Sequence, residues 1–348
     1  MIFAGDVAIA PGDQFAFRGF PAAVRRAPWC VNLEGAIAQS GESLNWGLCN
    51  TDTWSDSFSE FRLGPVFLAN NHVHDLQRGV VHTADLLRCA GLCSFGAGAN
   101  GCEAAKPVAV MSGKQSYVLV GFGWPIIGCR PASNSAAGVN QLDGHRVKKT
   151  VQALVKEHPG QHAVVVMHWN YEFERYPQPG HRWLAMDLID EGAYAVIGHH
   201  PHVVGPVERY RGRTIAYSLG NWAFSYGKHF GGRLKFPDSS FEQLAVELGE
   251  KSDVLHYARF APPSEIVYER LERVADLSLT SRAPFEGATH QEYAEWFKAN
   301  RCKKKLLPIY YDYEQSLSNR ARDNFVGARQ VLLDAAIRVG LKSLQRST

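Results

Sequence analysis

Residues 193–202 read AYAVIGHHPH, a short apolar run that ends in a glycine and a cluster of three histidines. A continuous apolar run of this length, closed by turn residues, predicts a buried β-strand. Alternate residues of an extended segment face the same side, so His200 and His202 can both reach one centre. Imidazoles packed this closely after a strand rarely serve packing alone. The stretch therefore predicts a binding site at the carboxyl end of a strand.

The same pattern recurs through the first two thirds of the chain. Each of five further apolar runs leads into a polar cluster with Gly, Asn, His, Asp or Glu: residues 2–4, 29–31, 66–69, 163–167 and 215–219. Segments with apolar spacing near 3.6 lie between them and predict helices at 83–90, 144–156 and 183–191. A strand pair is expected at 241–248 and 254–261. This alternation predicts an α/β (α+β) core, in which ligand sites form beyond the carboxyl ends of strands.

The pattern changes from about residue 264, where helix-period segments take over at 266–277, 290–300 and 313–344. We therefore expect a core domain at 1–262 and a helical C-terminal extension at 263–348. The basic run RCKKK at 301–305 has two interpretations, a solvated loop or a contact with an anionic polymer or membrane surface.

Composition is that of an ordinary globular protein. The chain has 348 residues, 45% apolar and 20% charged, with a formal charge of +3, which supports no nucleic-acid partner. Its seven cysteines are scattered without a CxxC pair, so we expect reduced thiols and no structural zinc site. The start MIFAGDVAIAPGD lacks a basic region and a long apolar run, and no stretch has the length of a transmembrane segment. We therefore expect a cytoplasmic protein with no transmembrane segment.

The polar residues at the predicted strand ends combine carboxylates, an amide and imidazoles: Asp6, Glu34, Asn71, His72, His168, His200 and His202. Singly, each has a plain structural explanation, such as a turn, a surface carboxylate or a core histidine. Their joint occurrence at successive strand ends favours a metal site. Mixed carboxylate and imidazole ligands suit Mn, Fe or Zn better than Mg²⁺ or Ca²⁺, which prefer oxygen alone.

Taken in order, these clusters resemble the motifs of the CapA family of bacterial capsule and poly-γ-glutamate synthesis proteins. The matching residues are Gly5-Asp6, Asn32-Leu33-Glu34-Gly35, Ala69-Asn70-Asn71-His72 with Asp75, Gly96-Ala97-Gly98 with Glu103-Ala104, His168-Trp169, residues 198–203 and residues 217–221. The resemblance covers about residues 1–225 and weakens beyond Asn221. That family is similar to the calcineurin-like metallophosphoesterases, which implies a four-layer αββα sandwich and a two-metal centre.

The resemblance also implies a role for each candidate. It assigns Asp6 and His202 to a first metal, Glu34 to a bridge between two metals, and Asn71, His168 and His200 to the second. His72 would be a catalytic general acid or charge stabiliser. Position 8, where the phosphoesterase motif has a metal-binding histidine, is Ala8. The resemblance therefore implies one or two divalent ions, since the first site lacks this histidine ligand.

Such a centre predicts a metal-dependent hydrolase of phosphoester or amide bonds, acting in capsule, exopolymer or related biosynthesis on a small or polymeric anionic substrate. Two alternatives stay open. One is a non-catalytic, polyanion-binding accessory protein that partners with a polymer synthase, and Ala8 favours it. The other is a tailoring enzyme for a small metabolite. Weaker candidates for substrate binding, each with a structural alternative, are Asn32, His199, Asn221, Trp169, Arg130 and Arg175.

Overall fold

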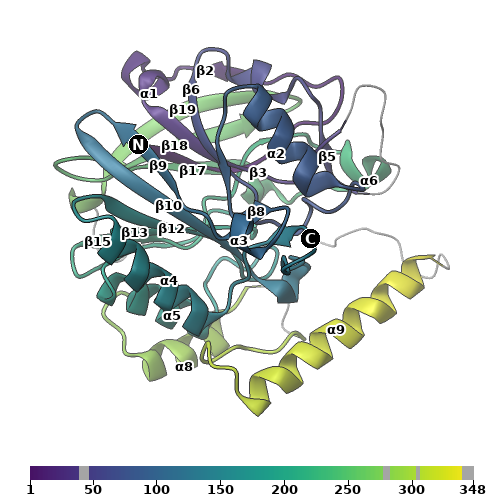
Figure 1. Ribbon diagram of the computed structural model, residues 1–348, viewed down its shortest axis with the longest axis vertical. Coiled ribbons are helices and arrows are strands. Elements are labelled where there is room, and N and C mark those ends of the chain that lie inside the picture. The colour runs from purple at the N-terminus through teal and green to yellow at the C-terminus, as the bar shows by residue number, and fades with distance from the viewer. Residues whose placement is uncertain (39–46, 277–282, 303–305, 339–348) are drawn as a thin grey trace.

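The computed structural model describes residues 1–38, 47–276, 283–302 and 306–338. Two β-sheets stack face to face, and helices lie on their outer sides (Figure 1). The arrangement is the expected four-layer, mixed α/β sandwich. No helix in these described ranges is both long and apolar enough to cross a bilayer.

The larger sheet is built around the first strand of the chain. Its spatial order is β2 (Ala16–Arg18), β19 (Glu265–Arg273), β18 (Val254–Ala261), β17 (Glu242–Glu247), β1 (Ile2–Ala8), β3 (Pro28–Leu33), β6 (Arg62–Phe67) and β7 (Ser94–Phe95), with β16 (Asn221–Phe224) also paired to β1. Strands β3 and β16 both run parallel to β1. Their carboxyl ends therefore meet at one edge of the sheet.

The smaller sheet supplies the opposite wall. Its order is β14 (Val207–Tyr210), β15 (Arg213–Ala216), β13 (Ala195–His199), β12 (His162–His168), β10 (Gln115–Gly123) and β9 (Val108–Ser112). Strands β10, β12, β13 and β15 are parallel, and His168 is in register with His199. Two short pairs flank the sheets, β4 (Ala36–Ile37) with β5 (Cys49–Asn50) and β8 (Ala97–Gly98) with β11 (Gly138–Val139).

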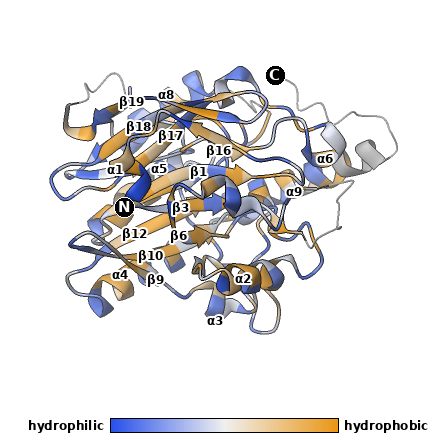
Figure 2. Cartoon of the chain, turned by 90° about the horizontal axis from the view of Figure 1, so that it is seen from above, coloured by the Kyte–Doolittle hydropathy of each residue, from blue (hydrophilic) through white to orange (hydrophobic). Residues whose placement is uncertain are grey.

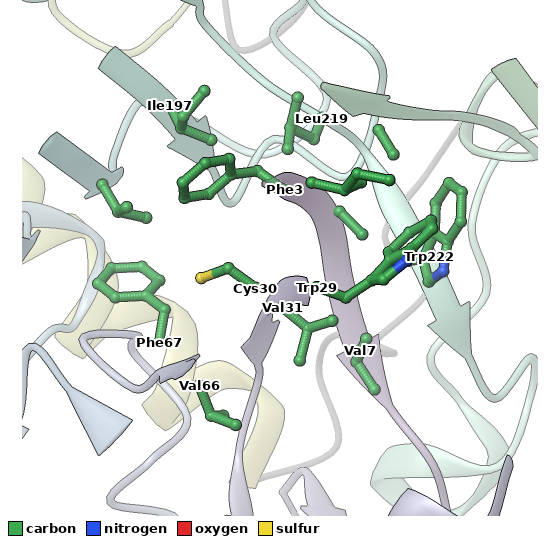
Figure 3. Close-up of a cluster of buried hydrophobic side chains, with 14 of the residues drawn as sticks. Phe3, Val7, Trp29, Cys30, Val31, Val66, Phe67, Ile197, Leu219 and Trp222 are labelled. Atoms are coloured by element: carbon green, nitrogen blue, oxygen red, sulfur yellow. The ribbon is translucent and has the colours of Figure 1, made fainter. Parts of the chain in front are cut away.

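Alternation along the strands divides the core into two clusters. On β10, Tyr117 and Leu119 pack between the sheets, whereas Val118 and Val120 face the helices. The inter-sheet cluster includes Phe3, drawn between the two walls in Figure 3. Hydrophobic residues are concentrated in the strands, as Figure 2 shows.

Helices cover both outer faces. On the smaller sheet lie α4 (Gly144–Glu157) and α5 (Pro179–Asp190), and α8 (His290–Asn300) packs on α5. On the outer side of the larger sheet lies α1 (Ala22–Arg26), and α2 (Gly79–Cys89) packs against β4, β7 and β8. The short η1 (Trp54–Phe58) precedes β6. The remaining elements are α3 (Gly101–Ala104), η2 (Pro125–Ile127), α6 (His229–Gly232), η3 (Asp238–Ser240), η4 (Val274–Asp276) and α9 (Leu317–Arg338). Caps define two of these helices: Asp143 accepts from the Arg146 amide at α4, and Thr289 and Glu292 form a capping box at α8.

The predicted helices at 144–156 and 290–300 and the strand pair at 241–248 and 254–261 are confirmed. The helix expected at 266–277 is wrong, because residues 265–273 form strand β19, which pairs with β18 along its length. This pairing and the burial of Ile266 outweigh a helix-like spacing of apolar residues. Residues 277, 303–305 and 339–344 of the predicted segments lie outside the described ranges.

The C-terminal segment packs against the smaller sheet's helices. Phe285, Tyr293, Phe297, Leu307 and Tyr310 are buried in the same cluster as the inner face of α5. The expected division at residues 262 and 263 falls in the turn between β18 and β19.

Candidate metal centre

Strand register places Asp6 at the middle of the centre. Asp6 on β1 pairs with Asn32 on β3 and with Asn221 on β16, and all three are buried. The preceding residue must be glycine, because a Cβ at Gly5 would stand 2.2 Å from the Gly220 carbonyl oxygen. That close approach lets the Asp6 amide donate to the same oxygen at 2.9 Å. The Gly-Asp motif is thus a packing requirement as well as a chemical one.

The Asp6 carboxylate is held by several donors. Oδ1 accepts from Asn32 Nδ2 at 2.8 Å and from His199 Nδ1 at 2.9 Å, and Oδ2 accepts from the His200 amide at 3.3 Å. Burial by itself raises the pKa of Asp6, but the hydrogen bond from His199 and the nearby His199 and His202 rings lower it below its ordinary value. The carboxylate is therefore kept ionised and fixed in orientation.

Glu34, one residue after β3, is shared by two groups of potential ligands. In a first triad, the ligand atoms of Asp6, Glu34 and His202 all lie within 4.8 Å of one another. In a second triad, so do those of Glu34, His168 and His200. All five side chains are buried. A carboxylate common to two adjacent triads is what a bridge between two metal ions requires.

His168 and Asn71 come from opposite sheets and meet at the centre. Asn71 Oδ1 lies 2.8 Å from His168 Nε2, and the His168 and His200 ring centroids are 4.9 Å apart. Burial, the larger effect, and the neighbouring imidazoles lower the pKa of His168 well below its ordinary value. Burial also lowers the pKa of His200, to about 3. Both rings are therefore neutral, the form in which histidine binds a metal.

The donor set fits a divalent metal. Among the described residues, the buried His200 Nδ1 has no hydrogen-bond partner, and a buried polar atom in that state is costly unless something binds it. The Asn221 Oδ1 atom accepts from His202 Nδ1 at 2.9 Å, which leaves Nε2 as the nitrogen directed to Glu34, 3.7 Å from Oε1. A partner on the other ring nitrogen is the usual means of orienting a metal-binding histidine.

The histidine loop has an unusual backbone. His200 has φ of 95° and His202 has φ of 58°, a left-handed region that side chains other than glycine adopt at a cost. The Asn221 contact with His202 holds this conformation, as does the Ser218 hydroxyl, which donates to the Val203 carbonyl at 2.7 Å. Strain of this kind is concentrated at functional sites.

His72 approaches Glu34 from the side and is oriented by Asp75. His72 Nδ1 donates to Asp75 Oδ2 at 2.8 Å, and the Leu48 amide donates to the same oxygen at 2.8 Å. His72 Nε2 lies 4.0 Å from Glu34 Oε1. The arrangement leaves Nε2 facing the centre.

Asn70 is a structural residue of the site, for which the sequence motif predicted no role. Its Oδ1 accepts from the Gly35 amide at 3.1 Å and the His72 amide at 3.2 Å. Its Nδ2 donates to the Leu33 carbonyl at 2.8 Å and to Asn32 Oδ1 at 3.3 Å. Asn70 thus ties two motif segments together, and its sequence signal is its place in the Ala69–His72 motif.

Aromatic rings form a wall beside the first triad. The His202 ring centroid lies 4.9 Å from Phe236, 5.5 Å from Phe224 and 6.3 Å from Phe173. Ala8 is buried in the same apolar cluster, and His229 Nε2 contacts the Ala8 carbonyl at 3.3 Å. This wall is contributed by separate segments whose phenylalanines carry no common sequence pattern.

The weaker candidates divide into three groups. The first group lies within the centre: Asn32 and His199 are hydrogen-bond partners of Asp6, and Asn221 is a partner of His202. Trp169 is instead a core residue: it is fully buried, stacks on His181 and donates from Nε1 to the Tyr217 carbonyl at 3.0 Å. Its ring therefore cannot line a cleft. Arg130 and Arg175 are exposed, and their role in substrate binding stays a prediction.

Fold and site together define a mixed α/β sandwich with a buried carboxylate–imidazole centre between the sheets. Residues 4–226, more than half of the chain, match the family described as bacterial capsule synthesis protein PGA_cap. The chain belongs to this family.

Curated relatives are similar over part of their length. The chain is 34% identical over 172 residues to a probable polyglutamine synthesis accessory protein of Mycobacterium tuberculosis, covering 46% of this chain and 44% of that protein. It is 29% identical over 163 residues to the capsule biosynthesis protein CapA of Bacillus anthracis, covering 46% and 40%. The chain thus spans less than half the length of these relatives.

Solved structures with remote likeness include a hypothetical protein from Thermus thermophilus, with 16% identity, coverage of 78% of this chain and 96% of that chain, and a TM-score of 0.42. Another is a putative 5'-nucleotidase from Staphylococcus aureus, with 13% identity, coverage of 86% and 59%, and a TM-score of 0.42. Nothing about the activity of this chain follows from likeness at this level.

Proposed function

We propose that this chain is a metal-dependent hydrolase that acts in capsule, exopolymer or related biosynthesis. The observation that supports the proposal is the Glu34 carboxylate, shared between two triads of buried ligands whose atoms lie within 4.8 Å of one another. The triads suit one or two divalent ions, Mn, Fe or Zn. Asn71 adds an amide oxygen beside His168, which is a member of the second triad.

A bound divalent ion supplies Lewis acidity at such a centre. The chain's own residues do the rest: Asn32 and His199 hold Asp6, and Asn221 holds His202. These ligands are buried, so the local dielectric constant is low. Electrostatic interactions with a substrate that displaces water from the centre are therefore stronger than in water.

His72 is the proposed general acid. Asp75 accepts the hydrogen bond from Nδ1, so Nε2 faces the centre and can give a proton to a leaving oxygen or nitrogen. Proton transfer by a positioned side chain contributes typically about 10²–10⁴-fold in rate. Phosphoester and amide bonds both suit this chemistry, and the proposed substrate is an anionic small molecule or polymer.

A second candidate is a non-catalytic accessory protein of a polymer synthase. Ala8, an apolar residue packed among phenylalanines beside the first triad, favours it, because no imidazole is available at that position. The mycobacterial relative is itself described as a probable accessory protein, which accords with this candidate.

Metal content separates the two candidates. We would measure divalent ions by elemental analysis on the purified chain and on His200→Ala, with His74→Ala as the matched control outside both triads. The hydrolase proposal expects about one or two ions per chain in the wild type and the control, and a loss of bound metal in His200→Ala. Phosphoesters and γ-glutamyl amides would then be screened for metal-dependent cleavage. No bound metal after reconstitution with Mn²⁺, Fe²⁺ or Zn²⁺ would overturn the proposal and favour the accessory protein.

A further inference from the structure

Helix α9 has an exposed apolar face. Leu317 is 84% exposed, Phe325 is 53% exposed and Leu332 is 70% exposed, and Ala321 and Ala328 between them are exposed too. The spacing of these five residues is four, four, three and four, so they lie on one side of the helix. The face runs for about 22 Å, from the rise of 1.5 Å per residue.

The other side of α9 already has its partner. Val326 is buried in the cluster of the smaller sheet's helices, and Asn319 donates to Asp312 Oδ1 at 2.8 Å. Figure 1 shows α9 at the margin of the molecule, with its outer side turned away from the other elements. The exposed face is therefore additional to the one that anchors the helix.

Between residues 317 and 332, the charges around this face are of one sign. On a helical projection, Arg320 and Arg329 border the apolar face on opposite sides. Asp323, the one acidic residue in the sequence from 317 to 332, faces the body, where its Oδ1 accepts from the Tyr310 hydroxyl at 2.7 Å. Between residues 317 and 332, the outer half of the helix thus combines apolar residues with two cations and no carboxylate.

We propose that α9 binds the surface of an anionic lipid bilayer. Leu317, Phe325 and Leu332 enter the boundary between headgroups and acyl chains, and the two arginines lie at the level of the phosphates. A helix with an apolar face and basic borders binds bilayers in this manner, through apolar burial and attraction to anionic lipid. Pairing with the same face of a second copy is disfavoured, because it would bring the arginine borders of the two helices together.

Vesicle co-sedimentation of the full chain tests this inference independently of the metal centre. Phosphatidylglycerol–phosphatidylcholine vesicles would be compared with pure phosphatidylcholine at low and moderate salt. We expect binding to the anionic vesicles that weakens with salt. The double variant Arg320→Gln/Arg329→Gln should lose about thirtyfold in affinity, from about 1 kcal/mol per basic residue at an anionic surface.

The apolar variant Phe325→Ser/Leu332→Ser should bind neither kind of vesicle. Met111→Ser, which removes a 54% exposed apolar residue from the distant edge strand β9, is the matched control and should bind as the wild type does. Far-UV circular dichroism and the thermal midpoint would check that every variant is folded. Equal vesicle binding by all variants would overturn the inference. Failure of the wild type to bind vesicles would also overturn it. That holds even if sedimentation velocity finds a dimer that the apolar variant abolishes, because the exposed face would then be a dimer interface.

Discussion

At the scale of single residues, His72 and His74 provide a natural comparison. Both follow β6, but His72 bonds to Asp75 and faces Glu34, whereas His74 Nε2 bonds to the Arg130 carbonyl at 3.3 Å. Only the first is placed to exchange a proton with a substrate at the centre. The general-acid role therefore depends on one histidine and on the carboxylate that orients it.

We predict that His72→Ala lowers kcat by about 10²–10⁴-fold on any substrate found, without loss of bound metal. Asp75→Asn should cause a smaller loss, because the ring remains but its orientation and charge stabilisation are weakened. His74→Ala is the control and should keep nearly full activity. Steady-state kinetics with parallel metal analysis would check this, and equal losses in His72→Ala and His74→Ala would contradict it.

His181 on α5 predicts how stability responds to acid. The ring is buried between Trp124 and Trp169, with centroids 4.6 Å and 5.0 Å away, and burial lowers the pKa of His181 from 6.5 to about 3. The unfolded chain therefore binds a proton that the folded chain does not between these two pH values. The contribution of this ring to the free energy of unfolding is therefore fully present above pH 6.5 and is lost as the pH decreases toward 3.

Replacing the His181 ring should remove its one-proton contribution to the pH dependence of stability. We predict that His181→Phe reduces the slope of unfolding free energy against pH by about 1.4 kcal/mol per pH unit between about pH 4 and 6. Urea unfolding at a series of pH values measures the slope. An unchanged slope in His181→Phe would mean that the buried ring is protonated in the folded chain.

At the scale of elements, much of the centre follows from strand ends. Parallel strands bring their carboxyl ends together, so Asp6, Glu34 and His168 could be grouped from apolar runs followed by polar residues. The phenylalanine wall could not, because Phe224 and Phe236 meet His202 only through tertiary packing. Strand β19 was missed for a related reason: its partner β18, rather than its own spacing, decides its conformation.

The junction of β1 with β16 gives an element-scale prediction. A side chain at Gly5 would collide with the Gly220 carbonyl, and backbone cannot yield as a flexible side chain can. We predict that Gly5→Ala destabilises the chain by about 3 kcal/mol and weakens metal retention, since Asp6 would shift. Gly101→Ala is the control, because its nearest contact would be an ordinary 3.7 Å. Chemical unfolding would compare the two variants, and equal stability would contradict the prediction.

At the scale of the whole molecule, a buried ion pair links the core to the C-terminal segment. Arg182 Nη2 donates to Glu208 Oε1 at 2.6 Å, and both side chains are almost inaccessible. The same guanidinium donates to the Ala288 carbonyl at 3.0 Å and lies 4.8 Å from the Tyr293 ring and 5.2 Å from the Phe285 ring. A buried charge is tolerated only while such partners surround it.

Two truncations should therefore behave oppositely. A chain ending at residue 262 keeps Glu208 but lacks β19 and the C-terminal groups that cover Arg182, namely the Ala288 carbonyl and the Phe285 and Tyr293 rings. Strand β18 then becomes an edge, and the buried ion pair is uncovered. We predict that it aggregates or lacks a cooperative unfolding transition. A chain ending at residue 316 loses α9 but keeps both sheets and the Arg182 surroundings, and it should unfold cooperatively with moderately reduced stability. Size-exclusion chromatography and thermal unfolding would distinguish them. A folded, cooperative 1–262 fragment would show instead that the core is an independent domain and that the C-terminal segment only packs against it.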